Sequence, residues 1–254
     1  ILESARATVL AAGLAMGSAH YHQVLPPPGR YPDPALMAYH RRALALAGQL
    51  GLKRVTTHPG WMFGSAMPEF TGEAARAFHA RTLSLTQLNQ VAFEAYGGET
   101  AVWRDSVDLY QRLCEWAATA GLAITLETAI SEWYGLTLHP DRLLEFHAAV
   151  RAPNLRFCLD AGHCHLNGLD VAAVARACAP ALLETHFHDN HGTRDEHLPL
   201  GAGTIDWPRV AQTLRATRYD GLITFEHPDP RRSAPPWRAA CARGRPQPLK
   251  EAGA

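Results

Sequence analysis

The hydrophobic residues of the chain gather in six short runs, and each run leads into a histidine, an aspartate or a glutamate. The runs have the apolar, β-prone composition of buried parallel strands. Enough residues separate successive runs for a crossover helix. Chance can place one such polar residue after one strand, but six in succession indicate a common functional site. The six residues are His20, His58, Glu127, Asp160, His186 and Glu226.

Segments with the periodicity of helices lie between the runs. Gly13, Gly51 and Gly121 follow three of these segments, as glycines that end a helix do. After Pro228 the chain becomes rich in Arg, Pro and Ala and loses its periodicity, which predicts a mostly irregular tail over residues 229–254. The predicted helices cover residues 2–12, 35–50, 73–95, 104–120, 140–151, 170–178 and 207–216.

This alternation of strands and helices predicts an α/β fold. Ligand-type residues at the C-terminal ends of successive parallel strands are typical of a (β/α)8 TIM barrel. Such a barrel closes with eight strands, whereas the pattern provides six. Because the chain opens on a helix, we expect the first two strands to be the missing ones. The barrel domain is thus predicted over residues 1–228, incomplete at its N-terminus and without an internal linker.

The charges of the chain balance, with 24 Lys and Arg against 24 Asp and Glu. Proteins that neutralise many phosphates usually carry a basic excess, so the balance disfavours a nucleic-acid partner. The 14 histidines are many for 254 residues. Because histidine is a common metal ligand and general base, the excess favours a metal site. The alternative is a compositional bias without function.

Cysteine usage bears on the compartment. The five cysteines are an odd number and form no CxxC pair, which disfavours disulfides and Cys-ligated zinc and predicts a reducing cytoplasm. The segment VLAAGLAMGSA (residues 9–19) has the apolar character of a signal peptide, but Glu3 lies where such peptides carry positive charge. No apolar run is long enough to span a bilayer, so no membrane partner is expected.

The first motif with chemical content is LDAGHCHLNG, which follows the fourth run. Its Asp160 and His163 are three residues apart, so that a carboxylate at a strand end and an imidazole on the next turn face one cavity. Taken alone, Asp160 is better explained as a helix cap and His163 as a core histidine. Glu127 and Glu226 have a similar alternative, a structural pairing with arginine. A carboxylate at the end of an apolar strand nevertheless needs some cationic partner, because its desolvation is costly.

The second motif begins at the fifth run, where HFHDNHG is followed by DEHLPLG. Asp195 and His197 alternate and therefore point the same way in an extended segment. Mixed Asp and His ligands without thiolates suit Zn²⁺, Mn²⁺, Co²⁺ or Mg²⁺. Asp189 and Asn190, just after His188, have a plain alternative as an Asx-type turn.

These two motifs, DxxH and HxxDNxGxxDEHLPLGxGxIDW, resemble those of the xylose isomerase-like TIM-barrel superfamily over roughly residues 2–228. Its members include sugar-phosphate isomerases and epimerases, ketose 3-epimerases, hydroxypyruvate isomerase, inosose dehydratase and endonuclease IV. The resemblance orders the six runs as strands three to eight of the barrel. The chain departs from the family pattern in lacking the first two strands and a recognisable final helix.

The resemblance also implies roles for individual residues. The family's four metal ligands match Glu127, Asp160, His186 and Glu226, and its substrate-side or second-metal histidine matches His163. Further ligands of multinuclear members match His58, Asp195, His197 and either His20 or His22.

Three more residues are candidates for substrate binding. His188 lies between the ligands of the second motif, and Arg194 has the planar fork that grips a phosphate or a carboxylate. Trp61, with Phe63 beside it, follows the second run and is a candidate wall of the pocket. The alternatives are a solvated surface role for Arg194 and ordinary core packing for the two aromatic residues.

The function expected from this pattern is isomerisation or epimerisation of a small sugar, hydroxy-ketone or sugar phosphate. A divalent metal would stabilise an enediolate while Glu127 and Glu226 move the proton and His163 polarises a substrate oxygen. No organic cofactor is expected, and a homo-oligomer is a possible assembly. The alternatives are a multinuclear-zinc phosphodiesterase of the endonuclease IV type and a non-catalytic barrel fragment.

Overall fold

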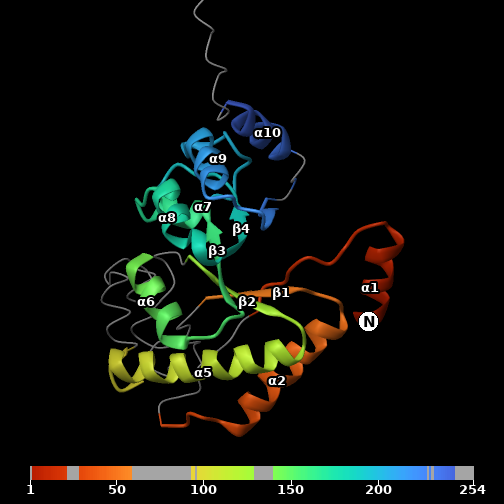
Figure 1. The fold of residues 1–254 in the computed structure, drawn as a ribbon, viewed down its shortest axis with the longest axis vertical. Helices are drawn as coiled ribbons and strands as arrows, with labels where there is room; N and C mark the ends of the chain where they lie inside the picture. Colours follow the sequence, from red (N-terminus) through yellow and green to blue (C-terminus); the bar gives the residue numbers. More distant parts are fainter. Residues whose placement is uncertain are drawn as a thin grey trace, which may run out of the picture. The chain divides into compact units, whose positions relative to one another are not determined.

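The computed structural model describes residues 2–21, 29–58, 93–94, 96–128, 140–227, 229 and 232–243 (Figure 1). The chain divides into two compact units, Ile1–Cys158 and Leu159–Ala254. Each unit combines parallel strands with helices, as the sequence predicts for an α/β fold.

The first unit contains three parallel strands in the order β1-β2-β3. The register pairs Thr57 with Leu126 and Glu127 with Cys158, so the ends of the three strands lie at one edge. Its elements are α1 (Leu2–Ala11), α2 (Pro34–Gln49), β1 (Arg54–Thr57), α5 (Glu99–Thr119), β2 (Ala123–Glu127), α6 (Pro140–Val150) and β3 (Leu155–Asp160), whose last two residues belong to the second unit.

Local sequence explains these helices. The Asp33 carboxylate caps α2 by accepting from the backbone N–H groups of Ala35 and Leu36, and the chain leaves the helix through Gly51 at a φ of 84°. A stripe of buried residues on α5 packs the helix against β2, and α2 and α6 contact α5 as well. The ring of Phe146 on α6 lies edge-on to Tyr110 on α5.

The second unit contains the parallel pair β4 and β5, in which His186 is the partner of Thr224. Asp160 and Asp206 cap α7 and α9 by accepting from one backbone N–H group each, and Asp170 caps α8 by accepting from two. Its elements are α7 (Ala161–Leu166), α8 (Val171–Cys178), the 3-10 helix η3 (Ala179–Ala181), β4 (Leu182–Phe187), α9 (Trp207–Ala216), β5 (Leu222–Phe225) and α10 (Ala234–Arg243).

Five of the six predicted strands are confirmed, and the sixth prediction is wrong. The run before His20 makes only a single parallel bridge, between His20 and Thr56. Two backbone hydrogen bonds hold it beside β1, from Tyr21 N to Thr56 O at 2.8 Å and from Thr56 N to Ala19 O at 2.9 Å. The predicted helix over residues 73–95 lies almost entirely outside the described residues.

The prediction of an irregular tail is wrong over α10, which packs against α9. Trp237 on this helix contacts Phe187 at the end of β4, with ring centroids 5.1 Å apart, and Trp207 at the start of α9. Phe187 is fully buried. Tertiary burial of one large aromatic residue therefore supports a helix that composition alone does not predict.

We expect Trp237→Ala to destabilise the protein by about 1–3 kcal/mol, because it removes aromatic area that packs on Phe187 and Trp207. Urea unfolding followed by circular dichroism measures the change. The control is Arg238→Ala, which truncates the exposed neighbouring side chain on the same helix. Equal midpoints for the two variants would show that α10 adds nothing to the stability of the unit.

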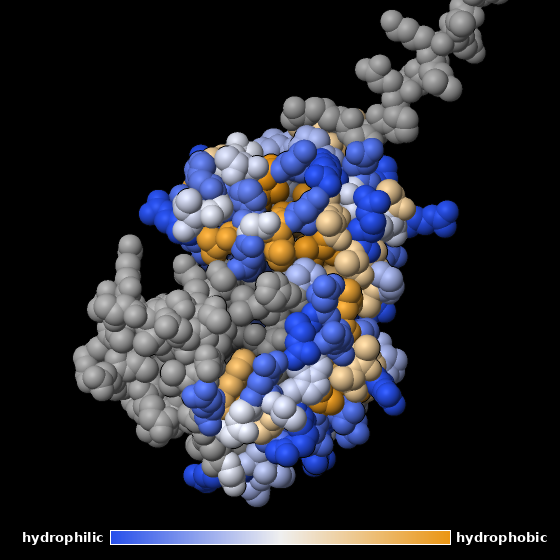
Figure 2. All heavy atoms as spheres, turned by 90° about the vertical axis from the view of Figure 1, so that its left-hand side faces the viewer, coloured by the Kyte–Doolittle hydropathy of each residue, from blue (hydrophilic) through white to orange (hydrophobic). Residues whose placement is uncertain are grey.

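The exposed surface carries few large apolar side chains. Among the described residues those of Leu10, Leu14, Tyr39 and Leu46 are exposed, all of them in the first unit. Figure 2 shows hydrophilic residues over much of the visible face, with apolar residues between them. None of the helices in the described part of the chain has the length and hydrophobicity to cross a membrane.

Candidate metal and active site

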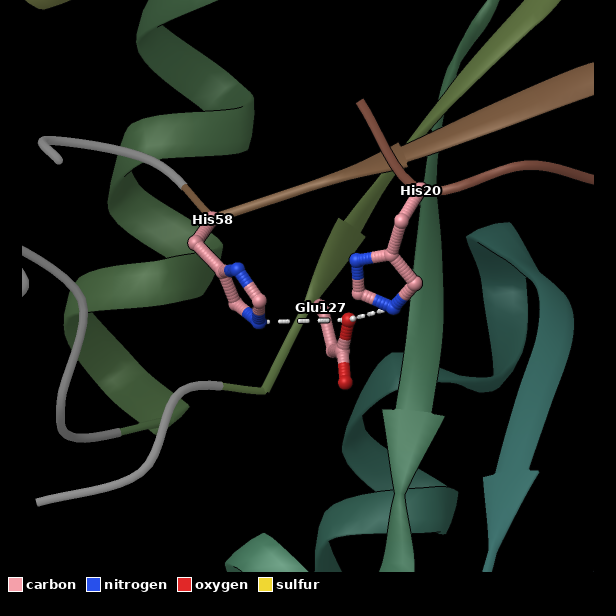
Figure 3. A group of neighbouring side chains, drawn as sticks. All are labelled: His20, His58 and Glu127. Carbon is pink, nitrogen blue, oxygen red and sulfur yellow. Dashed lines mark ion pairs between the residues drawn. The ribbon is translucent and has the colours of Figure 1, made fainter. Parts of the chain in front are cut away.

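Glu127, at the end of β2, is the centre of the candidate site in the first unit (Figure 3). Its side chain is 1% exposed, and one carboxylate oxygen lies between two imidazoles. His58 Nε2 is 3.2 Å from this oxygen and His20 Nε2 is 3.3 Å from it. Three of the predicted ligands thus lie together, His58 and Glu127 at strand ends and His20 at the single bridge to β1. The two imidazoles give the buried carboxylate the partners that it needs, because its desolvation is costly.

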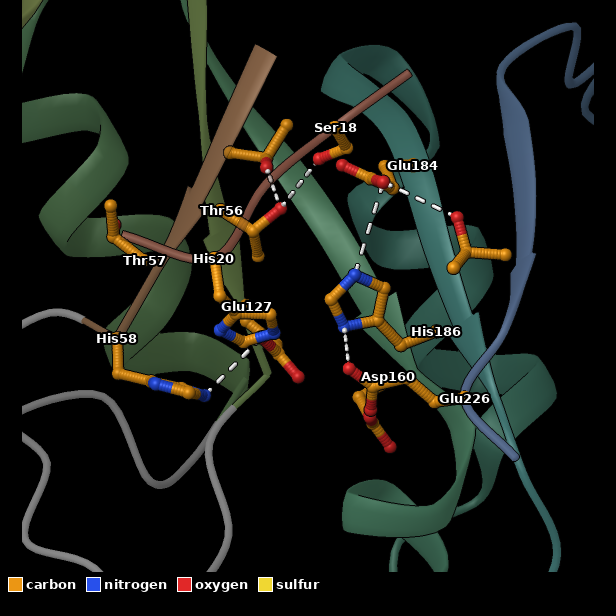
Figure 4. A network of polar contacts seen from close by, with 12 residues as sticks. Ser18, His20, Thr56, Thr57, His58, Glu127, Asp160, Glu184, His186 and Glu226 are labelled. Atoms are coloured by element: carbon orange, nitrogen blue, oxygen red, sulfur yellow. Dashed lines mark hydrogen bonds and ion pairs between the residues drawn. The ribbon is translucent and has the colours of Figure 1, made fainter. Parts of the chain in front are cut away.

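A layer of threonines lies in the strands beneath this cluster (Figure 4). The hydroxyls of Thr56 and Thr125 are 2.8 Å apart, and the Thr57 hydroxyl is 2.6 Å from the hydroxyl of Tyr110 on α5. All four side chains are fully buried. The first pair links β1 to β2 and the second links β1 to α5, so both help to fix the end of β1, which leads into His58.

Asp160 and His163 begin the candidate site of the second unit. Asp160 is fully buried at the end of β3, and its Oδ1 accepts a 2.7 Å hydrogen bond from the His163 backbone N–H. The other oxygen, Oδ2, is 3.7 Å from His163 Nδ1. Asp160 is therefore a helix cap, as the alternative predicted. The carboxylate also faces imidazole nitrogens, so capping is not its only interaction.

His188 is the second imidazole beside Asp160, with Nε2 3.1 Å from Oδ1 of the carboxylate. The ring is fully buried between Gly162 and His197, and it stacks on His197 with centroids 3.9 Å apart at 4°. A β-carbon at position 162 would overlap the ring, so only glycine fits there. Burial lowers the pKa of His188, but the neighbouring Asp160 and Asp195 carboxylates outweigh it and raise the pKa overall.

Asp195 and His197 approach His188 from the segment that follows β4. The His197 Nε2 atom is 3.0 Å from Asp195 Oδ2, and its Nδ1 atom is 2.8 Å from the backbone oxygen of Glu226. Both of these oxygens only accept, so both ring nitrogens donate and the ring is a cation. The hydrogen bond with Asp195 is the main reason that the pKa of His197 rises to about 9.

The pKa of Asp195 is lowered overall. Burial acts in the opposite direction, but the hydrogen bond from His197 and the charges of His188, His197 and His163 outweigh it. Asp195 Oδ1 is 3.6 Å from His188 Nδ1, so each nitrogen of the His188 ring faces a different carboxylate.

His186 and Glu226 form the last pair of predicted ligands, with Nδ1 of the imidazole 3.4 Å from Oε1 of the carboxylate. A third residue beside them escaped the sequence analysis. Glu184 is fully buried in β4, and its Oε1 atom is 3.9 Å from His186 Nε2 and 3.3 Å from the donating Thr224 hydroxyl. The sequence feature that could have identified Glu184 is its position two residues before His186, which puts both side chains on the same face of the strand.

The remaining predicted residues are placed as follows. The side chain of Arg194 is 77% exposed and pairs with Glu196 at 3.2 Å, which agrees with the surface alternative. Asn190 accepts from the backbone N–H of Gly192 at 2.9 Å, so the predicted Asx turn is confirmed for Asn190. Trp61, Phe63 and His22 lie outside the described residues.

The donor atoms fit a divalent cation. Two ligands of one ion with bonds of about 2.1 Å lie roughly 3.0–3.4 Å apart in octahedral or tetrahedral geometry. The carboxylate–imidazole separations of 3.1 Å at Asp160, 3.2 Å at Glu127 and 3.4 Å at Glu226 fall in this range. The donor set is imidazole and carboxylate, which suits Zn²⁺, Mn²⁺ or Co²⁺. Groups whose donor atoms all lie within 4.8 Å of one another include His20–His58–Glu127, Asp160–His163–His188 and His188–His197–Glu226.

Comparison with known proteins adds relatives of two kinds. An uncharacterised protein of Methanocaldococcus jannaschii is 32% identical over 117 residues, which cover 45% of this chain and 40% of that protein. The chain thus matches less than half the length of this relative. The crystal structure of a D-tagatose 3-epimerase-like protein has a TM-score of 0.67 at 18% identity and covers 95% of this chain and 81% of its own.

A 3-keto-D-glucoside 4-epimerase of E. coli has a TM-score of 0.63 at 18% identity, over 96% of this chain and 83% of its own. At this level of identity the two structures establish the barrel fold. The family model described as "Xylose isomerase-like TIM barrel" matches residues 13–247, which is most of the chain. The strand-end carboxylates and histidines therefore lie in a member of the xylose isomerase-like TIM-barrel family.

Proposed function

We propose that the chain is a metal-dependent isomerase or epimerase of a small sugar, another hydroxy-ketone or a sugar phosphate. The observation that carries the proposal is the pairing of a carboxylate with an imidazole nitrogen at 3.1–3.4 Å after three different strands. The structural relatives named above, which are a 3-epimerase-like protein and a 4-epimerase, support sugar chemistry of this kind. A cytoplasmic location and a homo-oligomeric assembly remain predictions.

The residues that would hold the cation are Glu127, Asp160, His186 and Glu226, which the sequence motifs match to the ligands of the family. When bound, a divalent ion polarises a carbonyl and a neighbouring hydroxyl and acidifies the adjacent C–H group. Glu127 and Glu226 are the groups proposed to remove and return the proton, because carboxylates act as general acids and bases. His163 would hydrogen-bond a substrate oxygen. No organic cofactor is required by this chemistry.

The test of this function is solvent exchange. We expect the Mn²⁺-loaded protein, incubated with a panel of ketoses in heavy water, to introduce deuterium at the carbon next to the carbonyl of its substrate. The carboxylates exchange their protons with solvent, whereas a hydride shift transfers hydrogen directly between carbons. Mass spectrometry reads the label. Product without a C–D bond would contradict the proton-transfer roles of Glu127 and Glu226 and leave the metal site intact.

A second function is favoured by the additional donors of the second unit. His163, His188, Asp195 and His197 lie around Asp160 and supply more ligands than a single ion requires. Such a surplus suits a multinuclear-zinc phosphodiesterase, in which a metal-activated water displaces a phosphate oxygen. The balanced charge of the chain argues against a nucleic-acid substrate.

Incision of DNA with an abasic site separates the two functions. The isomerase proposal predicts hydrogen exchange in a ketose and intact DNA, and the phosphodiesterase predicts the reverse. Metal analysis of the purified protein separates both from a non-catalytic fragment, which would contain no stoichiometric metal.

A further inference from the structure

The carboxylate of Asp189, directly beyond β4, is saturated with hydrogen bonds. The residue is fully buried. Its Oδ1 atom accepts from the backbone N–H groups of Asn190 at 3.0 Å and Ile205 at 3.2 Å. Its Oδ2 atom accepts from the backbone N–H of Gly201 at 2.8 Å and from the indole N–H of Trp207 at 2.8 Å. Four donors from a segment of 18 residues thus converge on one carboxylate, which leaves it no capacity to serve as a metal ligand.

The backbone around Asp189 closes the same segment. Asp189 and Leu198 exchange two backbone hydrogen bonds of 2.9 Å as an antiparallel bridge, and the Thr204 N–H donates to Asn190 O at 3.0 Å. Gly203 lies so close to Asp189 and Asn190 that a β-carbon there would overlap both. The Asn190 amide donates in turn to the Gly162 backbone oxygen on α7 at 2.9 Å. Several hydrogen bonds therefore hold the segment in place, although it contains no helix or strand.

The tied segment, residues 190–206, carries Asp195 and His197. These two residues lie in the part of the segment between the turn at Asn190 and the bridge at Leu198. His197 has a φ of 48°, a conformation that non-glycine residues rarely adopt and that surrounding contacts must maintain. The bridge at Leu198 fixes the backbone next to His197, and the hydrogen bonds of the ring to Asp195 and to the Glu226 backbone oxygen keep it stacked on His188.

We propose that Asp189 is a positioning residue that closes segment 190–206, so that Asp195 and His197 stay against His188. The role of the positioned pair at a bound ion rests on the proposed function. The closure of the segment does not, because all the hydrogen bonds that produce it lie within the second unit. Asp189 acts through Asp195 and His197, and it touches neither the ion nor the substrate.

The first test is hydrogen exchange, followed by mass spectrometry, of Asp189→Asn and the wild type without added metal. The amide of asparagine turns an N–H donor toward two of the four donors, whichever way it is oriented. We expect exchange of the 199–207 peptide to rise at least tenfold, while the β4 peptide, residues 182–187, keeps its wild-type rate. The matched control is Asp206→Asn at the end of the same segment, where asparagine caps α9 as well as aspartate does. Unchanged exchange in 199–207, or an equal rise in β4, would overturn the proposal.

The second test is Mn²⁺ titration of a double-mutant cycle. We expect Asp189→Asn to weaken Mn²⁺ binding at least tenfold in the wild-type background and less than twofold in a background that carries Asp195→Asn and His197→Asn, because the pair that Asp189 positions is then already absent. An equal loss in both backgrounds would overturn the positioning role. If the wild type binds no Mn²⁺, the proposed function fails, and the hydrogen exchange result still decides whether Asp189 closes the segment.

Discussion

Asp160→Asn is expected to weaken Mn²⁺ binding by at least about 100-fold, which is the upper end of the loss seen when only an outer partner of a metal ligand is removed. The carboxylate is fully buried at the end of β3 and lies 3.1 Å from an imidazole nitrogen of His188. The amide removes a negative charge from a place that water does not reach. Isothermal titration of the metal-free protein measures the affinity.

The chain offers a close control in Asp170→Asn. Asp160 caps α7 and Asp170 caps α8, each through backbone N–H groups. Asparagine caps a helix about as well as aspartate, so both replacements keep the caps. The affinity of the Asp170 variant should equal that of the wild type. Equal affinities for both variants would mean that Asp160 is a cap and nothing more.

Glu127→Gln is expected to lower kcat for ketose epimerisation by about 10²–10⁴-fold, the range that general acid–base catalysis contributes. Glutamine retains the shape of the side chain and its contacts with His20 and His58 but does not accept a proton from carbon. Steady-state rates at saturating Mn²⁺ separate this effect from weaker metal binding.

Glu115→Gln on the exposed face of α5 makes the same chemical change away from the strand ends and should leave kcat unchanged. A Glu127 variant with wild-type kcat under metal saturation would remove Glu127 from the proton-transfer step. Its role would then be limited to the pairing with the two imidazoles.

The sequence alone predicted most of the elements, for physical reasons that hold at short range. The buried runs before Glu127, Asp160 and His186 are strands because β-prone apolar residues between polar segments have few alternatives. The run before His20 also contains apolar residues but ends in three small ones, Gly17, Ser18 and Ala19, and it makes one bridge only. Local composition did not distinguish these two outcomes.

Helix α10 was missed because its stabilisation is tertiary. Pro235 and Pro236 suggested an irregular tail, yet both lie in the first turn of the helix, where a missing N–H is tolerated. The decisive contacts are those of Trp237 with the aromatic rings of β4 and α9, which no local pattern records.

The candidate site divides in the same way. The carboxylates and imidazoles at the strand ends and their order along the chain were predicted, because the end of a parallel strand is also an edge of the sheet. The partners of His188 were not predicted, because its stacking on His197 requires the nine residues that follow His188 to fold back on it. Glu184 was missed because an acid inside an apolar run has no local feature that separates it from any other polar position of a strand. Only the pairing of β4 with β5 identified its neighbour, Thr224.

The contact between Gly162 and His188 links two positions that are 26 residues apart in the chain. The ring occupies the space that any side chain at 162 would need. The DxxH motif thus has a steric requirement, a glycine at its third position, when an imidazole lies two residues after His186. In relatives of this chain the two positions should vary together. A residue larger than glycine at position 162 should be accompanied by a residue smaller than histidine at position 188. Glycine at 162 together with histidine at 188 can thus serve as a sequence marker for relatives that place a buried imidazole beside the aspartate of the motif.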